Sequence, residues 1–415
     1  MCIRDRQKEV LLYLHAIYET LQLDQYTMFS VEVDRLEWNE GESLWYVDFT
    51  DGRRVKAKFI HAGTGQVPVA VYPDVTGLET YEGVAFHSSD WRHDVSLRNQ
   101  RVGIVGTGAS GVQIIPAIAD EVTHLTVFQR NAPYVIARND KPFSQRQKRL
   151  FKTSKTFRTL YRQYLYWRHE LNALAYFWNK KLLSIVSRET QSHIRRHIPD
   201  EDVRETMRPS YKAGCKRILV SDDYYPTLAK EHVDLVASAV SQIEGKTVTC
   251  LDGTTHEIDI LVFATGFDGT RPIPGVDVIG RNGRNLHEEW DVSGVEAFYG
   301  TQVSGFPNLF LLIGPNVGLS HNSVLFMMEA QVEYVQRLVD WSTKTDTPAD
   351  ISKTAQDSYN HKLSERMRKT IWQTGGCKSW YHDHEKRNVG LWPTYTFRFR
   401  NELRQVSIRE QVDAN

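Results

Sequence analysis

The sequence is poor in the features that mark several large protein classes. Its 415 residues contain no apolar run near the ~20 residues that cross a bilayer, so we expect no transmembrane segment. Its 51 Lys and Arg equal its 51 Asp and Glu, so no net charge attracts the chain to nucleic acid or to an anionic membrane. Any anion that it binds must be held by local groups.

Cysteine is also scarce, and its spacing argues against several kinds of site. The chain has four cysteines, which lie far apart and form no CxxC pair: Cys2, Cys215, Cys250 and Cys377. This spacing argues against a zinc site, a dithiol redox centre and a disulfide framework. We therefore predict no metal site and a reducing, cytoplasmic location.

The composition is that of a globular protein, with 41% hydrophobic and 25% charged residues and a mean hydropathy of -0.45. At about 150 residues per domain, two or three domains fit. Met1 to Arg6 resembles neither a signal peptide nor a strand, and we interpret it as a spurious start.

The residues that follow predict a helix and a small antiparallel meander. A helical pattern at 8–23 precedes three alternating apolar segments with a turn at Asp51-Gly52. The predicted strands are 29–36, 44–49 and 55–61. The meander ends in the glycine-bearing loop Ala62-Gly63-Thr64-Gly65.

A nucleotide-binding unit begins at the apolar strand Arg101 to Val105, which runs into a GxGxxG loop, a helical segment at 112–119 and a second strand at 124–128. The loop residues are Gly106, Thr107, Gly108, Ala109, Ser110 and Gly111. Glycines at these spacings allow the tight turn, the approach of a pyrophosphate and the packing of helix on strand. Because the loop lies between a strand and a helix, we predict a bound dinucleotide.

The end of the second strand indicates which dinucleotide. An NAD site would have Asp or Glu there, whereas this chain has Gln129-Arg130. Two charge-assisted bonds from arginine to a 2′-phosphate, at ~1.5–3 kcal/mol each, would favour NADP by roughly 10² to 10⁴. The alternative is that Arg130 is an exposed, solvated side chain.

Residues 141–209 are polar, aromatic and helical, and we expect an insert of two or three helices in the nucleotide unit. Its aromatic residues are Phe143, Phe151, Phe157, Tyr161, Tyr164, Trp167, Phe177 and Trp178. We predict that the insert packs as a cap over a substrate cleft. Because Lys and Arg interleave with the aromatic residues, a membrane-surface role is the alternative.

After the insert, a strand ends in a second run of small residues. Predicted strands lie at 234–237, 246–250 and 258–264. The last ends at Ala264-Thr265-Gly266, where small side chains let the chain pass close to a cofactor or cross between domains. The loop at 62–65 has the same character. Two such crossings predict an α/β fold with two Rossmann-like nucleotide-binding domains joined by a pair of connectors.

The segment before the GxGxxG loop resembles a known signature. It runs from Tyr81 through Gly83 and His87 to Trp91, in the pattern FxGxxxHxxxW of Baeyer–Villiger monooxygenases and their flavin-containing monooxygenase relatives. Tyr81 replaces Phe, and Arg92 stands where that family usually has Pro or Asp. The resemblance implies that His87 couples the movement of the two domains from the linker between them.

The resemblance extends over residues 7 to 405 and implies further roles. Gly214-Cys215-Lys216-Arg217 looks like the segment that carries the family's active-site arginine, so Arg217 would be catalytic and Lys216 would lie near the NADP phosphate. The permanent charge of an arginine would stabilise a peroxyflavin anion and its adduct with a ketone.

Two later segments resemble parts of the family's cofactor site. Gly314-Pro315-Asn316, with the helical segment at 327–341, would lie beside the isoalloxazine ring of FAD, and Trp380 would contact NADP. Cys215 and Cys377 are expected to be bystanders.

The family's own opening strand, GxGxxG loop and acidic residue for FAD do not occur before Tyr81, nor do its Gly-Gly-x-Trp segment and the aspartate that partners the arginine. The resemblance therefore implies a homologue truncated at its N-terminus, with an incomplete FAD domain. The implied parts are a remnant of the FAD domain, a linker with the signature, an NADP domain with the insert, and the C-terminal part of the FAD domain, at 1–75, 76–100, 101–268 and 269–415.

The implied function is that of a FAD- and NADPH-dependent monooxygenase that inserts one oxygen atom of O₂ into a ketone through a C4a-peroxyflavin, giving an ester or lactone. We expect the 415-residue chain itself to bind NADP weakly, to hold little FAD and to turn over poorly. Two alternatives stay open: N- or S-oxygenation, which would not need Arg217, and a non-catalytic NADP-binding fragment. The substrate would be a small apolar ketone or another apolar molecule.

Overall fold

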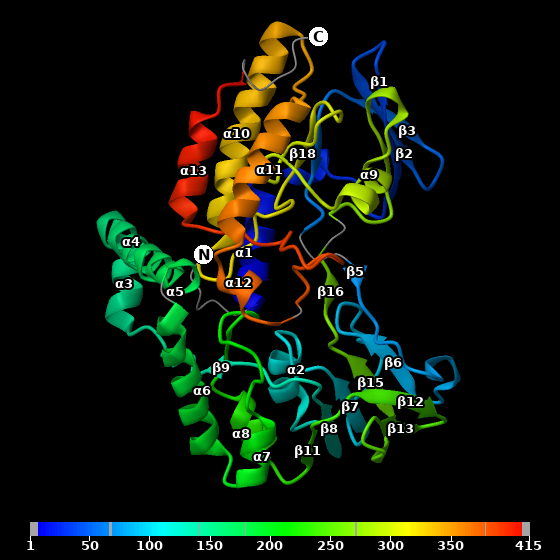
Figure 1. Cartoon of the computed structure of the whole chain (residues 1–415), viewed down its shortest axis with the longest axis vertical. Helices are drawn as coiled ribbons and strands as arrows, with labels where there is room; N and C mark the ends of the chain where they lie inside the picture. Colours follow the sequence, from blue (N-terminus) through cyan, green and yellow to red (C-terminus); the bar gives the residue numbers. More distant parts are fainter. Residues whose placement is uncertain are drawn as a thin grey trace.

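The computed structural model describes residues 7–65, 69–139, 141–178, 180–269, 272–377 and 379–408. The segment Met1 to Arg6 lies outside them. Two parts lie one above the other in Figure 1: α10, α11 and α13 belong to the upper part, and a parallel sheet forms the lower part.

The α-helices are α1 (Gln7–Thr20), α2 (Gly111–Ile118), α3 (Gln145–Thr153), α4 (Lys155–Leu171), α5 (Ala173–Phe177), α6 (Leu183–His197), α7 (Glu201–Thr206), α8 (Tyr224–Leu228), α9 (Leu286–Ser293), α10 (Val324–Thr345), α11 (Lys353–Met367), α12 (Ile371–Thr374) and α13 (Thr396–Gln405). Short 3-10 helices are η1 (Leu23–Tyr26), η2 (Leu78–Thr80), η3 (Lys180–Leu182) and η4 (Arg281–Gly283).

The strands are β1 (Val33–Asn39), β2 (Leu44–Phe49), β3 (Arg54–Ala57), β4 (Ile60–Ala62), β5 (Val69–Ala70), β6 (Val84–His87), β7 (Arg101–Val105), β8 (His124–Phe128), β9 (Val135–Ile136), β10 (Leu219–Val220), β11 (Val233–Val236), β12 (Val240–Glu244), β13 (Thr247–Cys250), β14 (Thr255–Glu257), β15 (Ile260–Phe263), β16 (Phe267–Asp268), β17 (Asp277–Ile279) and β18 (Leu309–Leu311).

The predicted meander is present, with two corrections. β2 has the predicted bounds, but β1 begins at Val33 instead of Phe29, because Ser30 has a φ of 55° that interrupts the extended chain. The predicted third strand is two strands. β3 pairs with β2, whereas β4 pairs in parallel with β18, so the chain changes sheets between them.

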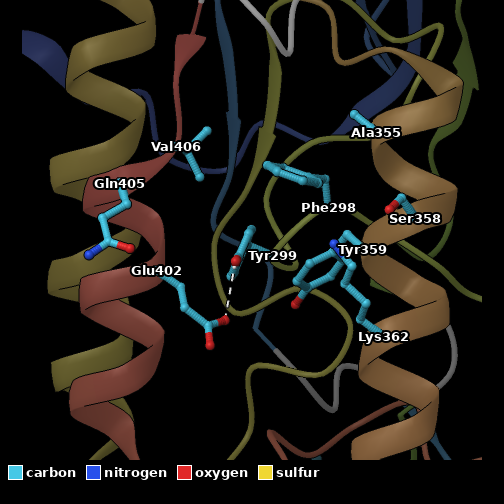
Figure 2. A pocket seen from close by; sticks show the side chains of 9 residues that line it. All are labelled: Phe298, Tyr299, Ala355, Ser358, Tyr359, Lys362, Glu402, Gln405 and Val406. Carbon is cyan, nitrogen blue, oxygen red and sulfur yellow. Dashed lines mark hydrogen bonds between the residues drawn. The ribbon is translucent and has the colours of Figure 1, made fainter.

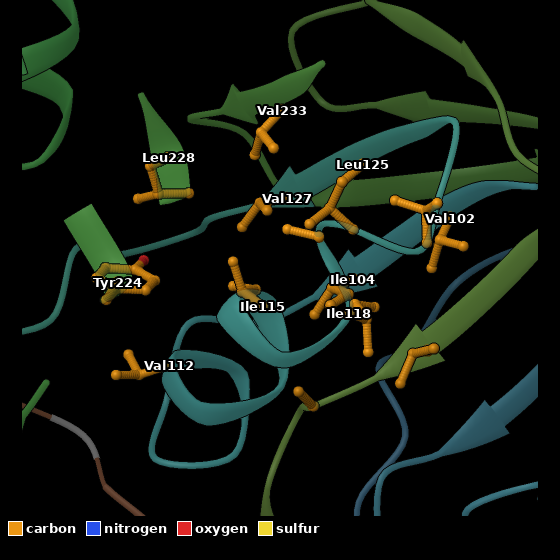
Figure 3. Packing of buried hydrophobic residues seen from close by; sticks show 14 of the residues in the cluster. Val102, Ile104, Val112, Ile115, Ile118, Leu125, Val127, Tyr224, Leu228 and Val233 are labelled. Atoms are coloured by element: carbon orange, nitrogen blue, oxygen red, sulfur yellow. The ribbon is translucent and has the colours of Figure 1, made fainter. Parts of the chain in front are cut away.

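The predicted βαβ unit is confirmed and lies in a five-stranded parallel sheet of order β11-β8-β7-β15-β6. Helix α2 packs on it through side chains that are fully buried, among them Ile104, Ile115 and Val127 (Figure 3). At the start of β7, Arg101 donates to both carboxylate oxygens of Asp259, at 2.9 and 3.0 Å. These bonds hold the pKa of Asp259 well below its usual range.

A small antiparallel sheet, β12-β13-β14, flanks this core. Only β13 was among the predicted strands; β12 and β14 are additional. The turn at Asp252-Gly253 that joins β13 to β14 is confirmed, and Gly253 has the positive φ of 85° that such a turn requires.

The predicted pair of connectors is present between the two parts of the molecule (Figure 1). β5 and β16 follow the two runs of small residues and pair with each other, Ala70 opposite Phe267. The Thr265 hydroxyl donates to the Val71 carbonyl at 2.5 Å, which ties the two connectors together. The chain therefore crosses between the parts twice, side by side.

The insert holds five α-helices, α3 to α7, so the expectation of two or three helices is wrong. Polar residues that end or start helices divide the helical pattern: Ser154 caps α4, and Asp200 accepts the backbone N–H groups at the start of α7. On α4, Glu170 is buried and accepts the Thr396 N–H at 2.5 Å, which fixes the insert to the start of α13.

An adjacent face of α4 is exposed and apolar, with Leu160, Tyr164, Trp167 and Leu171 between 51% and 65% exposed. The cap and membrane-surface hypotheses for the insert both stay predictions.

Helix α10 is the longest element and extends beyond the predicted 327–341 at both ends. Its buried Gln331 accepts the Ile313 N–H at 2.9 Å and donates to the Gly300 carbonyl at 2.9 Å, which fixes the loop that leads to Gly314. Within the described part of the chain, no helix has the length and apolar character to cross a membrane.

Candidate active site

The GxGxxG loop has the shape that its glycines predict. Gly106 has a φ of 111°, and a Cβ there would lie 2.5 Å from the Ala264 carbonyl oxygen. A Cβ at Gly111 would lie 2.2 Å from the Gly106 carbonyl oxygen. Around Gly108 nothing lies within 4 Å of the Cβ position, so the backbone there faces open space. Gly106 and Gly111 therefore allow close packing of the backbone, and Gly108 leaves room for a ligand.

The remaining loop residues attach this turn to its surroundings. The Thr107 side chain is buried and donates to the Asn131 carbonyl at 3.3 Å. Ser110 precedes the first residue of α2, and the Gly108 carbonyl accepts the Val112 N–H at 3.0 Å. The dipole of α2 favours a negative charge at this end of the helix.

Two cations approach each other beside this loop. Arg130 is exposed at the end of β8. Burial lowers the pKa of Lys216, and the charge of Arg130 lowers it further, which places the two side chains close together. The Lys216 ammonium lies 4.9 Å from the Tyr211 ring centroid. Two cations held together favour a bound anion.

Gln129 has a different environment from its neighbour. It is buried, and its side-chain amide donates to the Thr206 carbonyl at 3.0 Å. This bond fixes the end of β8 to α7 of the insert. Arg130, by contrast, is exposed and accessible to a ligand.

The signature residues surround the connectors. His87 is fully buried, with ring centroids 5.5 Å from Tyr72 and 5.3 Å from Phe267, and its Nδ1 lies 2.7 Å from the Ser89 hydroxyl. Burial lowers the pKa of His87, while the Gly266 backbone acts in the opposite direction. The His87 ring thus packs against residues of both connectors.

The other signature residues support this linker. Tyr81 donates to the Ile258 carbonyl at 3.1 Å, and Trp91 packs edge-on against Phe86 at 5.2 Å. A Cβ at Gly83 would lie 2.5 Å from the Asp259 carbonyl oxygen, so the glycine allows close contact with β15.

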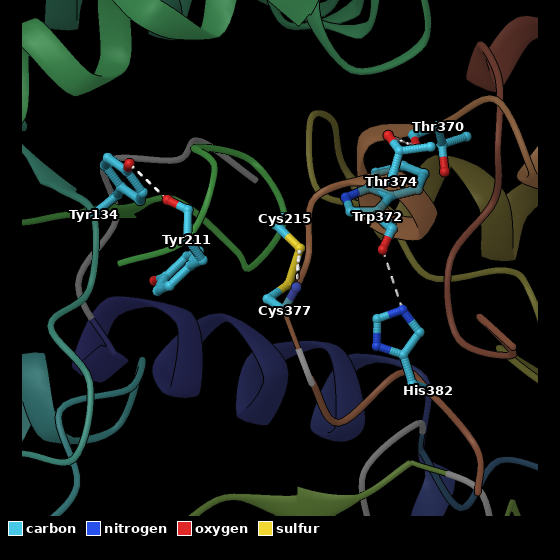
Figure 4. Close-up of a disulfide and its surroundings, with 8 residues drawn as sticks. All are labelled: Tyr134, Tyr211, Cys215, Thr370, Trp372, Thr374, Cys377 and His382. Atoms are coloured by element: carbon cyan, nitrogen blue, oxygen red, sulfur yellow. Dashed lines mark hydrogen bonds between the residues drawn. A yellow bond between two sulfur atoms is a disulfide. The ribbon is translucent and has the colours of Figure 1, made fainter. Parts of the chain in front are cut away.

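The prediction that Cys215 and Cys377 are bystanders is wrong. They form a disulfide, with Cα atoms 6.1 Å apart and 162 residues between them in sequence (Figure 4). The cysteine spacing also predicts no disulfide framework, and that prediction is wrong at this pair. The two cysteines are far apart in sequence, and only folding brings their loops together. Cys250 is free and buried.

Arg217 lies two residues after Cys215 and is exposed. Burial raises the pKa of Tyr176 to about 12, and the nearby charge of Arg217 opposes this rise. Arg217 therefore lies near Tyr176, a buried residue of α5 in the insert, and its side chain is exposed.

The Gly314-Pro315-Asn316 loop meets the segment that follows Trp380. Asn316 has a φ of 59°, its N–H donates to the Val389 carbonyl at 2.7 Å, and its side chain donates to the Asn388 carbonyl at 2.8 Å. A small recess of about 10 Å³ lies here, lined by Gly269, Pro272, Ile313, Gly314, Pro315, Val389 and Gly390.

The Trp380 ring packs against two glycines of this recess, because it would lie 2.7 Å from a Cβ at Gly269 and 3.5 Å from a Cβ at Gly390. The structure thus joins Trp380, the second connector and the Gly314 loop. Gly269 and Gly390 were missed in the sequence, where isolated glycines in loops give no signal of a close approach.

A larger cavity, of about 310 Å³, lies elsewhere, between α11 and α13 (Figure 2). Its aromatic wall includes Tyr299, which donates to Glu402 at 3.2 Å. None of the predicted site residues lines it. No group of three or more His, Cys, Asp or Glu in the described ranges could hold a metal ion.

Comparison with known proteins shows the family to which the chain is similar. The flavin-binding monooxygenase-like family matches residues 50–278. A Baeyer-Villiger monooxygenase of Pseudomonas aeruginosa is 36% identical over 402 residues, which cover 96% of this chain and 76% of that protein. One of Streptomyces coelicolor is 37% identical over 409 residues, 97% of this chain and 78% of that protein.

The chain belongs to the flavin-binding monooxygenase-like family. Solved structures show the same fold. A closed crystal structure of cyclohexanone monooxygenase matches with a TM-score of 0.86 and 23% identity over 99% of this chain and 85% of that one. The OTEMO complex with FAD and NADP matches with a TM-score of 0.87 and 22% identity over 98% and 84%.

The residues of this flavin-binding monooxygenase-like chain fit one dinucleotide at the GxGxxG loop, where Gly108 leaves open space, and Arg130 and Lys216, which lie near each other, are the candidates for a phosphate. The sequence has a single GxGxxG, so the described residues offer no second loop of this kind for FAD. The recess between Gly269, Gly314 and Gly390, at about 10 Å³, has room for about one water molecule and is too small for a flavin ring in this conformation.

Proposed function

We propose that the protein is a FAD- and NADPH-dependent monooxygenase that inserts one oxygen atom of O₂ into a small apolar ketone and releases an ester or lactone. The proposal is supported by its two relatives named Baeyer-Villiger monooxygenase, with 36% and 37% identity. The structural observation that carries it is the accessible Arg217, whose loop is linked covalently to the loop of Trp380.

NADPH would bind at the GxGxxG loop. The N–H groups at the start of α2 would face its pyrophosphate, and the 2′-phosphate would take its charge-assisted bonds from Arg130 and Lys216. Trp380 would pack against the nicotinamide end. Ala264, Thr265 and Gly266 would let this dinucleotide pass close to the connector.

FAD, when bound, would accept hydride from NADPH and react with O₂. Arg217 would hold the negative charge that develops on oxygen as the ketone carbonyl is attacked, because a guanidinium stays protonated at any working pH. Loss of one such donor costs ~10² to 10³ in rate. His87, packed against residues of both connectors, would transmit movement of one part of the molecule to the other.

The domain boundaries given above and a cytoplasmic location are further parts of the proposal. The Cys215–Cys377 disulfide argues against a cytoplasmic location, because such bonds are more usual in oxidising compartments.

The test is an assay of Arg217→Ala and Arg217→Lys beside the parent, with a ketone, a sulfide and a tertiary amine. We expect ester formation to fall about 10²-fold in Arg217→Ala, with sulfoxidation retained. Arg168→Ala, an exposed arginine of α4, is the matched control. Equal loss on all substrates would contradict the role of Arg217, and oxidation of only the sulfide and amine by the parent would support N- or S-oxygenation.

A further inference from the structure

The Cys215–Cys377 disulfide joins two loops that carry predicted site residues. On one loop, Lys216 and Arg217 follow Cys215 directly; on the other, Trp380 lies three residues after Cys377. The bond closes a separation of 162 residues, and in Figure 4 it lies between Tyr134 and Tyr211 on one side and Trp372 of α12 on the other. One covalent link therefore limits the distance between the Arg217 loop (residues 213–218) and the Trp380 loop (residues 375–382).

The Trp380 loop contacts the Cys215 sulfur closely. The Cys377 N–H donates to the Cys215 Sγ at 3.2 Å. A Cβ at Gly375 would lie 2.6 Å from both the Cβ and the Sγ of Cys215, and Gly376 has a φ of 76°. Two glycines in succession thus let the chain turn around this sulfur.

Polar links between the two loops are otherwise few. In the described residues of 213–218 and 375–382, the hydrogen bond from Cys377 to Cys215 is the only one recorded between the loops. The remaining contact is apolar packing, which includes Ala213, Ile218, Trp380 and Tyr381. Without the disulfide, the apolar packing and one weak N–H to sulfur bond would hold the two loops together, while the bonds of Asn316 to Val389 and Asn388 would still hold the far end of the Trp380 segment.

The disulfide is reachable by a reductant from one side. Cys215 is fully buried, whereas Cys377 is half-buried. A thiolate would therefore attack the Cys377 sulfur, with the Cys215 sulfur as the leaving group. A dithiol would supply the two electrons and two protons, and would itself become a disulfide as both cysteines return to thiols.

We propose that the Cys215–Cys377 disulfide is a positioning cross-link that holds the Trp380 loop against the Arg217 loop in the arrangement that binds NADPH. Reduction by a dithiol loosens the Trp380 loop at its Cys377 end and weakens NADPH binding. The choice of NADPH as the ligand rests on the proposed function; the tethering of the loop does not.

The experiment compares the unreduced protein, the dithiothreitol-reduced protein and Cys377→Ser. Hydrogen exchange of the peptide covering 379–391 reports on the loop, and titration with NADPH reports on binding. Mass spectrometry of the unreduced digest identifies the linked peptides. The control is Cys250→Ser, which changes the free cysteine of β13 and keeps the cross-link.

We expect the linked peptides in the unreduced protein, faster exchange of 379–391 after reduction and in Cys377→Ser, and a Kd for NADPH about tenfold higher in both. Cys250→Ser should respond to dithiothreitol as the parent does. Absence of the linked peptides, or equal exchange and equal Kd in all forms, would overturn the proposal. Faster exchange together with no NADPH binding in any form would uphold the tether and contradict the proposed function instead.

Discussion

Replacing Gly108 by alanine separates ligand binding at the GxGxxG loop from the packing of that loop. Nothing lies within 4 Å of the Cβ position, and Gly108 is not among the glycines with positive φ. The folded protein should therefore accept the methyl group, with a change in stability within about 1 kcal/mol. The same methyl group would stand where a pyrophosphate approaches, and the Kd for NADPH should rise about tenfold, or 1.4 kcal/mol.

Gly106→Ala should behave in the opposite way. A non-glycine residue at a φ of 111° costs about 1–3 kcal/mol, and the Cβ would lie only 2.5 Å from the Ala264 carbonyl oxygen, a backbone atom that cannot turn aside. Overpacking of this kind adds about 1–3 kcal/mol, so the free energy of unfolding should fall by about 2–6 kcal/mol.

Thermal unfolding and titration with NADPH would be measured for both variants. Gly41→Ala is the control, because its Cβ position meets only the Asn39 side chain, at an ordinary 3.5 Å, and it lies in the turn between β1 and β2. A Gly108→Ala protein that binds NADPH as tightly as the parent would refute the assignment of this loop as the ligand cradle. A Gly106→Ala protein as stable as the parent would refute the packing argument.

Three further predictions concern charge and cofactor content. Arg130→Ala should weaken NADPH binding about 10- to 100-fold and leave NADH binding unchanged, which paired titrations would show; equal effects on both would contradict a 2′-phosphate contact. Asp259→Asn should lower stability by about 2–3 kcal/mol near pH 7. Because the folded pKa of Asp259 is depressed, its contribution is present above the ordinary value of 3.8 and is lost as pH falls below it, so unfolding curves of parent and variant should converge in acid; a difference that persists there would contradict this. The purified chain should show little flavin absorbance per mole, and a band near one flavin per chain would overturn that expectation.

The parts of the fold that could be predicted have short-range causes. β2 alternates buried and half-buried side chains along its length, and its predicted bounds agree with the structure. The GxGxxG loop carries its geometry in adjacent residues, so its strand, turn and helix follow from sequence alone. The division of the third strand at Lys58-Phe59 could not be predicted, because it depends on pairing with β18, about 250 residues away.

The site shows the same limit. His87, Gly83 and Trp91 are close in sequence and could be found as one pattern. Cys215 and Cys377 could not be paired, since loops far apart in sequence have no local signal of their meeting. The recess at Gly269 and Gly390 was missed for a related reason: a glycine that lets another chain pass looks like any loop glycine until its neighbour is known.

The most direct test of the proposed activity is the isotope content of the product. The protein would be supplied with FAD in excess, NADPH, a small apolar ketone and ¹⁸O₂, and the ester or lactone would be analysed by mass spectrometry. The account predicts a product that carries one ¹⁸O atom and that is absent when NADPH is omitted. An unlabelled product, or oxidation of NADPH with no ester or lactone, would contradict it.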